Sequence, residues 1–350
     1  MKNQLCRLAC LLLCLLTLTG CAYSPARGSQ PADPEAGEES RLYLDSMDTF
    51  LSLTAYGSNR EAALEAAQAE ILRLDALWSI GAEDSEISRL NRTGSGELSA
   101  DTAAIVQRAL ELYEDTEGCF DITVSPLMEL WGFYSKDYRV PDSRDLAEAM
   151  AKLGSDRLRF DAVTGSLTLE PGQAIDLGGI AKGYTSQRLV ELWRDMGLSS
   201  GLVSLGGNIQ CLGAKPDGSP WRVGIQDPAD AAGLAAVVQV TDRAVITSGG
   251  YERFFTDEAT GERYQHIIDP STGYPVESGL ASVSIITADG TLGDGLSTAL
   301  YIMGLERAAD YWRQHREDFE AIFIDEAGNL TITPGLEGSV SSQREVRVLS

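Results

Sequence analysis

The alternation of apolar and polar residues predicts strands and helices in mixed order along this chain. Residues 42–55 alternate as a strand does, and apolar side chains then recur at helical spacing from Arg60 to Trp78. Two more helices are predicted over 101–117 and 144–153. We interpret these helices as structural.

The second half of the chain is richer in predicted strands. Short apolar runs bounded by turn residues predict strands over 157–160, 166–169, 201–205, 221–225, 235–240, 244–247, 281–287, 321–324 and 330–333. Helices are predicted after residue 180 and over 296–303 and 305–314. Helices among antiparallel hairpins favour an α+β fold, with one large domain of mixed, mostly antiparallel sheets and flanking helices.

The N-terminus predicts where the protein works. Lys2 and Arg7 flank an apolar run that is too short to span a membrane, as in a secretory signal. Small residues before Cys21 resemble a bacterial lipoprotein cleavage box, so residues 1–20 are a predicted signal and Cys21 a predicted lipid anchor. Residues 21–40 have the composition of a tether, 41–338 form the predicted domain, and 339–350 a tail. The expected location is the extracytoplasmic face of the bacterial cell membrane.

Charge and cysteine content narrow the class of protein. The formal charge is −24, and it becomes more negative by two if Lys2 and Arg7 leave with the signal. Such a charge repels nucleic acid and anionic lipid headgroups, so a phosphate ligand would need a metal ion. Of six cysteines, only Cys119 and Cys211 fall in the folded part, which excludes a disulfide framework and a zinc cluster. Whether these two pair stays open.

A glycine-rich segment, Ile175–Tyr184, is predicted as a strand-to-helix junction. Its spacing matches neither the Walker motif nor the dinucleotide-binding motif. It offers Asp176 as an acceptor for a ring N–H or a hydroxyl, glycines that let a ligand approach the backbone, and Lys182 in the first helical turn. A tight corner in which the glycines only relieve crowding is the alternative.

Two oxygen-bearing residues, Asp294 and Thr298, lie four positions apart on one face of a predicted helix. A hard cation such as Mg²⁺ takes oxygen ligands, so one carboxylate, one hydroxyl and a nearby carbonyl would suffice to hold it. The alternative is that Asp294 caps its own helix by accepting backbone N–H bonds. The local pattern does not decide between them.

One of the two histidines, His266, precedes two isoleucines and a predicted sharp turn that begins at Asp269. Asp269 is able to bond the backbone amides of that turn. His266 is either a half-buried strand residue satisfied by the backbone or a phosphate contact or acid-base group.

Several segments in the same order carry a family resemblance. They are Asp84–Asn91, Phe120–Leu127, Ile175–Tyr184, Leu205–Ile209, Thr247–Gly249, His266–Pro275 and Asp294–Leu300. From roughly Arg41 to Thr333 the chain resembles the ApbE-type FAD:protein FMN transferases, which are bacterial extracytoplasmic flavin transferases.

The resemblance implies an activity and a site. The activity is Mg²⁺-dependent transfer of FMN from FAD to a threonine or serine hydroxyl of an acceptor protein in a membrane or extracellular redox system, with release of AMP. The implied metal ligands are Asp294, Thr298 and the carbonyl of Gly179. The implied FAD contacts are Met47, Cys119, Phe120, Asp121, Asp176, Lys182 and Ile268. Either a carboxylate near the metal or His266 takes the proton of the acceptor hydroxyl.

The chain also departs from the family pattern at three positions. Gly81 lies where members often have an aromatic residue, Asp48 replaces a usual glycine, and Ser297 lies where some members place another carboxylate. The first departure leaves the balance of transfer against hydrolysis open. An FAD pyrophosphatase that releases FMN and AMP, and a non-catalytic flavin-binding lipoprotein, therefore remain as alternatives.

Overall fold

Strands with apolar residues on both faces build one large sheet, which organises the fold. The computed structural model describes residue 35 and residues 37–350. The predicted signal, Cys21 and most of the predicted tether lie outside these residues.

The large sheet has nine strands, and neighbouring strands are antiparallel except for β15 and β17. Its order is β1 (Glu39–Ser46), β2 (Thr49–Tyr56), β6 (Gly201–Leu205), β7 (Asn208–Leu212), β10 (Ala244–Gly249), β13 (Leu280–Thr287), β14 (Phe319–Asp325), β15 (Leu330–Ile332) and β17 (Val346–Val348). Because successive strand residues point to opposite faces, Val283 and Ile285 of β13 enter one core, whereas Ile286 enters another.

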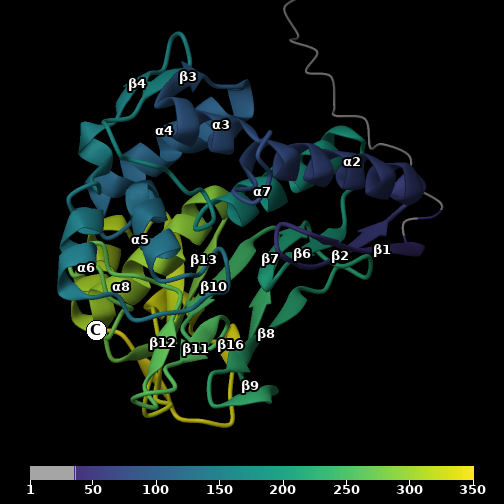
Figure 1. Ribbon diagram of the computed structural model, residues 1–350. Coiled ribbons are helices and arrows are strands. Elements are labelled where there is room, and N and C mark those ends of the chain that lie inside the picture. Colours follow the sequence, from purple (N-terminus) through teal and green to yellow (C-terminus); the bar gives the residue numbers. More distant parts are fainter. Residues whose placement is uncertain (1–34, 36) are drawn as a thin grey trace, which may run out of the picture. The chain divides into compact units, whose positions relative to one another are not determined.

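The helices cover one face of this sheet. They are α2 (Arg60–Trp78), α3 (Glu86–Thr93), α4 (Ala100–Asp115), α5 (Ser125–Leu130), α6 (Ser143–Met150), α7 (Ala181–Asp195) and α8 (Gly290–His315). In Figure 1, α2 and α7 run along β2, β6 and β7. Buried residues of these helices, such as Ile71 and Trp193, join Leu51 and Val203 of the sheet in one cluster.

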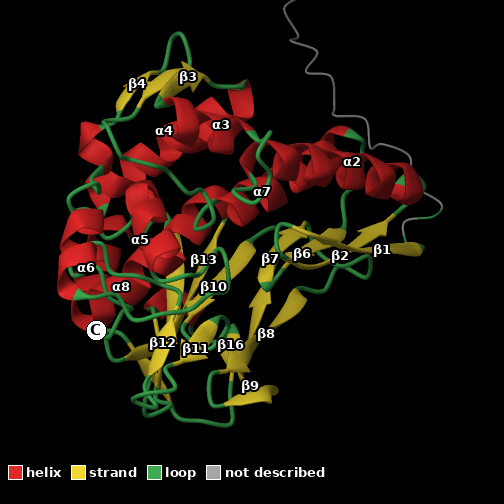
Figure 2. Cartoon of the chain, in the orientation of Figure 1, coloured by secondary structure: helices red, strands yellow, loops and turns green. Residues whose placement is uncertain are grey.

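Smaller sheets complete the architecture. They are β3 (Ser95–Glu97) with β5 (Ser166–Thr168) and β4 (Arg159–Asp161), β11 (Phe254–Thr256) with β12 (Arg263–Gln265), and β8 (Trp221–Asp227) with β9 (Asp230–Val240) and β16 (Val340–Ser341). In Figure 2 the β8–β9 pair lies away from the helices. Trp221 and Val238 of this pair share a core with Ile286 and Ile322 of the large sheet. The fold is therefore α+β with mostly antiparallel sheets, as predicted.

The predicted single strand over 42–55 is wrong in one respect, because it is a hairpin. Met47 and Asp48 have φ values of 52° and 57°, so the chain reverses between β1 and β2. Leu42 and Leu44 then lie opposite Leu53 and Leu51. The inward residues are even-numbered in β1 and odd-numbered in β2. This switch from even to odd positions was the signal in the sequence that indicated a turn.

The predicted strand before the glycine-rich junction does not form. Ile175 is instead held by the side-chain amide of Asn91, which bonds both its N–H and its carbonyl at 2.8 Å. The helix after the junction begins at Ala181, so Lys182 lies in its first turn as predicted. The predicted break between two late helices is confirmed as a kink at Gly304 of α8.

Residues 339–350, which the sequence set apart as a tail, supply β16 and β17. Within the residues described, no helix combines the length and apolar character that crossing a bilayer would require.

Candidate active site

The first turns of α7 and α8 meet at a glycine. A Cβ atom on Gly183 would lie 2.2 Å from the carbonyl oxygen of Gly290 and 2.5 Å from the Cβ of Asp294. Both neighbours belong to α8 and one is backbone, so only glycine permits this approach. The contact brings together two segments that the sequence singled out separately. We refer to this contact region as the α7–α8 junction.

Asp294 is buried at this junction and bonds to the other helix. It is 4% exposed, and its Oδ2 accepts the backbone N–H of Gly183 at 2.7 Å. The alternative that Asp294 caps its own helix is wrong, because α8 begins at Gly290 and its cap is Asp289, which accepts from the N–H of Leu292. The carboxylate instead lies at the positive end of α7.

Hydroxyl oxygens gather around Thr298, one helical turn after Asp294. A Cβ on Gly179 would lie 4.0 Å from Thr298 Oγ1, which places the glycine-rich segment beside the hydroxyl one turn after Asp294. The Ser248 hydroxyl, near the end of β10, lies 3.3 Å from Thr298 Oγ1 and 2.7 Å from Ser297 Oγ. The two predicted side-chain ligands and the backbone of the predicted third are thus neighbours.

This donor set fits a hard divalent cation. It has one carboxylate, hydroxyl groups and glycine backbone, which are oxygen donors of the kind Mg²⁺ prefers. Burial raises the pKa of Asp294, opposed by the Lys182 ammonium and by the Gly183 N–H. A bound cation would offset the free-energy cost of burying the Asp294 carboxylate. No group of three His, Cys, Asp or Glu side chains suited to a metal occurs among the described residues.

Phe120 lines the glycine-rich segment, and Cys119 precedes it in the chain. Phe120 is 4% exposed, and its ring lies 3.2 Å from the position of a Cβ on Gly179 and 3.7 Å from one on Gly295. Cys119 is a buried free thiol whose Sγ lies 3.5 Å from an Arg307 nitrogen. Burial raises its pKa. Of these two predicted FAD contacts, Phe120 lies against Gly179 of the glycine-rich segment and Gly295 of α8.

Asp121, another predicted FAD contact, is held by Thr123 in its own turn and by the more distant Ser155. Its Oδ1 accepts the N–H and hydroxyl of Thr123 at 2.7 and 2.6 Å and the Ser155 hydroxyl at 2.6 Å. The side chain is 7% exposed. These bonds explain its burial without any ligand.

Asp176 has a partner that the sequence did not suggest. Its Oδ2 accepts the Tyr134 hydroxyl at 2.6 Å, and its Oδ1 accepts the N–H of Gly178 at 2.7 Å. The N–H of Asp176 donates to the carbonyl of Ile122 at 2.7 Å. The acid is therefore fixed between two of the segments that carry the resemblance.

Lys182 supplies the positive charge at the α7–α8 junction. Its Nζ donates to the carbonyl oxygen of Gly178 at 3.3 Å. Its charge opposes the rise that burial causes in the pKa of Asp294 and of Glu252, and it adds to the fall that burial causes in the pKa of His266. One ammonium thus acts on groups from three separate segments.

His266 is half-buried directly after β12. Its Nδ1 lies 3.1 Å from the carbonyl oxygen of Arg253. A carbonyl only accepts, so Nδ1 carries the proton and Nε2 is left as an acceptor in the neutral ring. Burial, and then the charges of Arg253 and Lys182, lower its pKa to about 4. The imidazole is therefore neutral at pH 7.

The following turn forms as predicted, since Asp269 Oδ1 accepts the N–H of Ser271 at 2.8 Å. Ile267 belongs to the same cluster as Phe120, whereas Ile268 packs among Trp131 and its aromatic neighbours. Ile268, a predicted FAD contact, therefore belongs to a different hydrophobic cluster from Phe120.

Met47 lies in the β1–β2 turn and packs against the cluster that contains Phe120. Its N–H donates to Asp75 Oδ2 at 3.2 Å, which also accepts the Ser46 hydroxyl at 2.6 Å. The turn is therefore fixed to α2.

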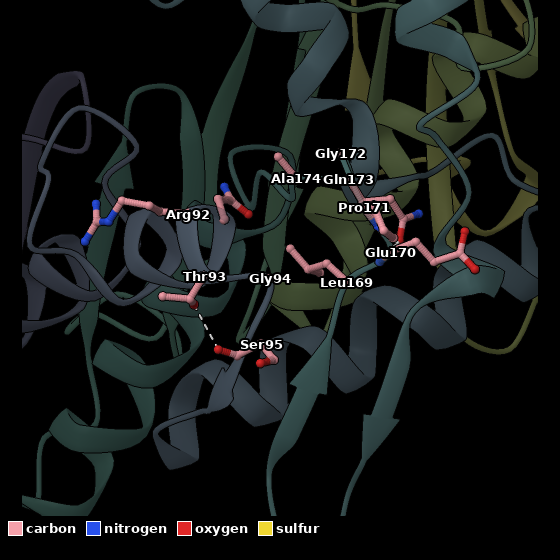
Figure 3. A pocket seen from close by; sticks show the side chains of 11 residues that line it. Arg92, Thr93, Gly94, Ser95, Leu169, Glu170, Pro171, Gly172, Gln173 and Ala174 are labelled. Atoms are coloured by element: carbon pink, nitrogen blue, oxygen red, sulfur yellow. Dashed lines mark hydrogen bonds between the residues drawn. The ribbon is translucent and has the colours of Figure 1, made fainter.

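The open groove in Figure 3 lies outside this junction. It has a volume of about 470 Å³ and is lined by Asn91–Ser95 and Leu169–Ala174. The Thr93 hydroxyl donates to the carbonyl of Ser95 across its floor. The groove contains none of the predicted site residues, so we place the chemistry at the α7–α8 junction.

Sequence reasoning missed Ser248 and Tyr134 as members of the site. Ser248 was inside a segment that carried the resemblance, so its position was available as a signal. Tyr134 lies outside those segments, and its bond to Asp176 spans 42 residues. Local spacing could not find it.

Comparison with known proteins identifies the family. A profile of the ApbE family matches residues 47–323. The chain is 33% identical to the FAD:protein FMN transferase of Escherichia coli K12, over 91% of this chain and 92% of the relative. It is also 33% identical to the enzyme of that name from Salmonella typhimurium, over 94% of each.

Solved structures give the same result. The ApbE protein of Thermotoga maritima aligns with a TM-score of 0.81 at 30% identity, covering 88% of this chain and 100% of that one. The flavin transferase ApbE of Vibrio cholerae aligns with a TM-score of 0.77 at 27% identity, covering 86% and 99%. The resemblance predicted from the sequence is confirmed: the chain belongs to the ApbE family.

Proposed function

We propose that this chain transfers FMN from FAD to a threonine or serine hydroxyl of an acceptor protein, with release of AMP and with Mg²⁺ as cofactor. Its curated relatives are enzymes that carry the name FAD:protein FMN transferase. The observation that carries the proposal is the 2.7 Å bond between Asp294 and the Gly183 N–H. It joins a cation ligand to a helix N-terminus, which is where a diphosphate is favoured.

Asp294, Thr298 and the carbonyl of Gly179 would hold the cation. Bound there, a divalent ion supplies neutralisation of the charge that develops on the diphosphate oxygens. The Lys182 ammonium in the first turn of α7 favours the same anionic ligand. Phe120 lies against Gly179.

His266 is the proposed general base, and its ring nitrogen Nε2 is the proton acceptor. Asp294 is less suited, because its carboxylate already accepts the Gly183 N–H and is assigned to the cation. In the transfer, the acceptor oxygen bonds to the phosphorus of the FMN unit as the bond from that phosphorus to the AMP oxygen breaks. The hydroxyl proton goes to His266.

We propose that the protein is located at the extracytoplasmic face of the cell membrane. Residues 1–20 have the layout of a secretory signal, and Cys21 lies at the position of a lipidated cysteine. Lipidation would hold the enzyme at the extracytoplasmic face of the membrane, where membrane redox complexes and extracellular flavin reductases present acceptors. Cys21→Ser is expected to move the protein from the membrane fraction to the soluble fraction, and retention in the membrane would contradict the anchor.

The decisive experiment incubates the purified full chain with FAD and Mg²⁺, with and without an acceptor subunit that bears a candidate threonine. We expect AMP release and a fluorescent acceptor band in a denaturing gel, and loss of both with a chelator. Release of AMP and free FMN without labelling would instead favour a pyrophosphatase. Binding of FAD without AMP release would favour a non-catalytic flavin-binding protein.

A further inference from the structure

A tyrosine beside the glycine-rich segment has no role in the reaction described so far. We propose that Tyr134 is a positioning residue, which fixes the Asp176 carboxylate so that it accepts an N–H or O–H of the bound flavin dinucleotide. The inference rests on the proposed function, because it assigns FAD as the ligand of Asp176.

The hydrogen-bond direction is set by the partners of Tyr134. Its hydroxyl lies 2.6 Å from Asp176 Oδ2 and 3.2 Å from Ser125 Oγ. A carboxylate only accepts, so the single phenol proton lies on the short bond to Asp176, and the Ser125 hydroxyl donates to the phenol oxygen. Burial raises the pKa of Tyr134 well above its usual value, so the phenol keeps its proton.

The second carboxylate oxygen is held as well. Asp176 Oδ1 accepts the N–H of Gly178 at 2.7 Å. Each carboxylate oxygen of Asp176 accepts one bond. Because a carboxylate has about four acceptor sites, each oxygen keeps a further lone pair. Asp176 is only half-buried, so these lone pairs remain accessible. Without Tyr134, one of the two fixing bonds is lost and the carboxylate can rotate.

The position of Asp176 favours a ligand contact over a purely structural role. It lies three residues before Gly179, which is beside Phe120 and Thr298. A fixed acceptor in that place lowers the ordering cost of binding. A chemically similar pair, Tyr113 with Asp156 at 3.0 Å, makes no hydrogen bond to the described residues of the glycine-rich segment and serves as a control.

The test compares Tyr134→Phe with the matched control Tyr113→Phe in the full chain, and repeats Tyr134→Phe in an Asp176→Ala background. FAD affinity is measured by flavin fluorescence, and KM and kcat by AMP release with Mg²⁺. We expect Tyr134→Phe to weaken FAD binding and raise KM about tenfold, with kcat at saturating FAD little changed. Tyr113→Phe should leave all three unchanged.

The Asp176→Ala background distinguishes positioning of Asp176 by Tyr134 from a general loss of protein stability. If Tyr134 acts through Asp176, Tyr134→Phe adds no further loss of FAD affinity once Asp176 is alanine. An unchanged FAD affinity in Tyr134→Phe, or an equal loss in both backgrounds, would overturn the inference, as would a lowered Tm with unchanged affinity. If the wild type binds FAD but releases no AMP, the transferase proposal fails while the affinity comparison still tests Tyr134.

Discussion

Two buried aspartates, Asp121 and Asp294, are held in different ways. The Oδ1 of Asp121 accepts three bonds, two from Thr123 and one from the Ser155 hydroxyl, 34 residues away. Asp294 lies where the first turns of α7 and α8 meet and accepts an amide of α7, and burial raises its pKa. Burial of an acid therefore does not by itself identify a cation ligand, and what distinguishes Asp294 is its place between two helix N-termini.

The largest expected effect is on the Asp294 side of this comparison. Asp294→Asn keeps an oxygen for the Gly183 N–H but removes the charge that would hold the cation. We expect AMP release to fall by about 10³-fold or more, with Tm equal to or above that of the metal-free wild type. AMP release close to the wild-type rate would contradict the assignment.

Gly183→Ala should show how tightly the α7–α8 junction is packed. Its Cβ would lie 2.2 Å from a backbone carbonyl of α8, and a shift of either helix would lengthen the bond between Gly183 and Asp294. We expect a loss of about 3 kcal/mol in the free energy of unfolding, measured with urea. Gly81→Ala is the matched control, because the nearest atom to its Cβ is 3.9 Å away, and it should cost little. Equal stability of the two variants would refute the close approach.

Asp121→Ala tests the other aspartate. Removing the acceptor of three bonds should cost about 2 kcal/mol of unfolding free energy. AMP release per folded molecule should change by only a few-fold, because Thr123 and Ser155 already satisfy the acid. The family resemblance implies an FAD contact at this residue. Unchanged stability with lost FAD affinity would support that role and would erase the contrast with Asp294.

A pH-dependent effect concerns His266, whose pKa the charge of Lys182 helps to lower. Its folded pKa of about 4 lies below the unfolded value of about 6.5. Between these pH values the unfolded chain binds more protons, so stability is lost as pH falls. Relative to His266→Asn, the wild type should lose at most about 1.4 kcal/mol per pH unit across this window. Parallel stability curves would contradict a depressed pKa.

Much of the fold was predictable because its elements are long and periodic. The helix over Arg60–Trp78 has the predicted bounds, and the break at Gly304 was visible as a glycine between two helical patterns. Short elements were missed, among them β7, β11 and β12, since three to five residues carry little periodicity. The hairpin at Met47–Asp48 was missed because non-glycine residues occupy its left-handed positions.

The candidate site was predictable in composition but not in contacts. The sequence could place Asp294 and Thr298 on one helix face, because that relation is local. It could not place Gly183 against Asp294, nor Tyr134 against Asp176, because those contacts depend on how distant elements pack. It therefore left the helix-cap alternative for Asp294 open, and only the tertiary contact removed it.

On the proposed function, the α7–α8 junction binds one divalent cation through Asp294 and Thr298. The most direct measurement is Mn²⁺ binding to the FAD-loaded full chain, followed by electron paramagnetic resonance of free Mn²⁺, for the wild type and Asp294→Asn. We predict one Mn²⁺ bound per wild-type chain and strongly weakened binding in the variant. Equal Mn²⁺ affinity in the two proteins would contradict the claim.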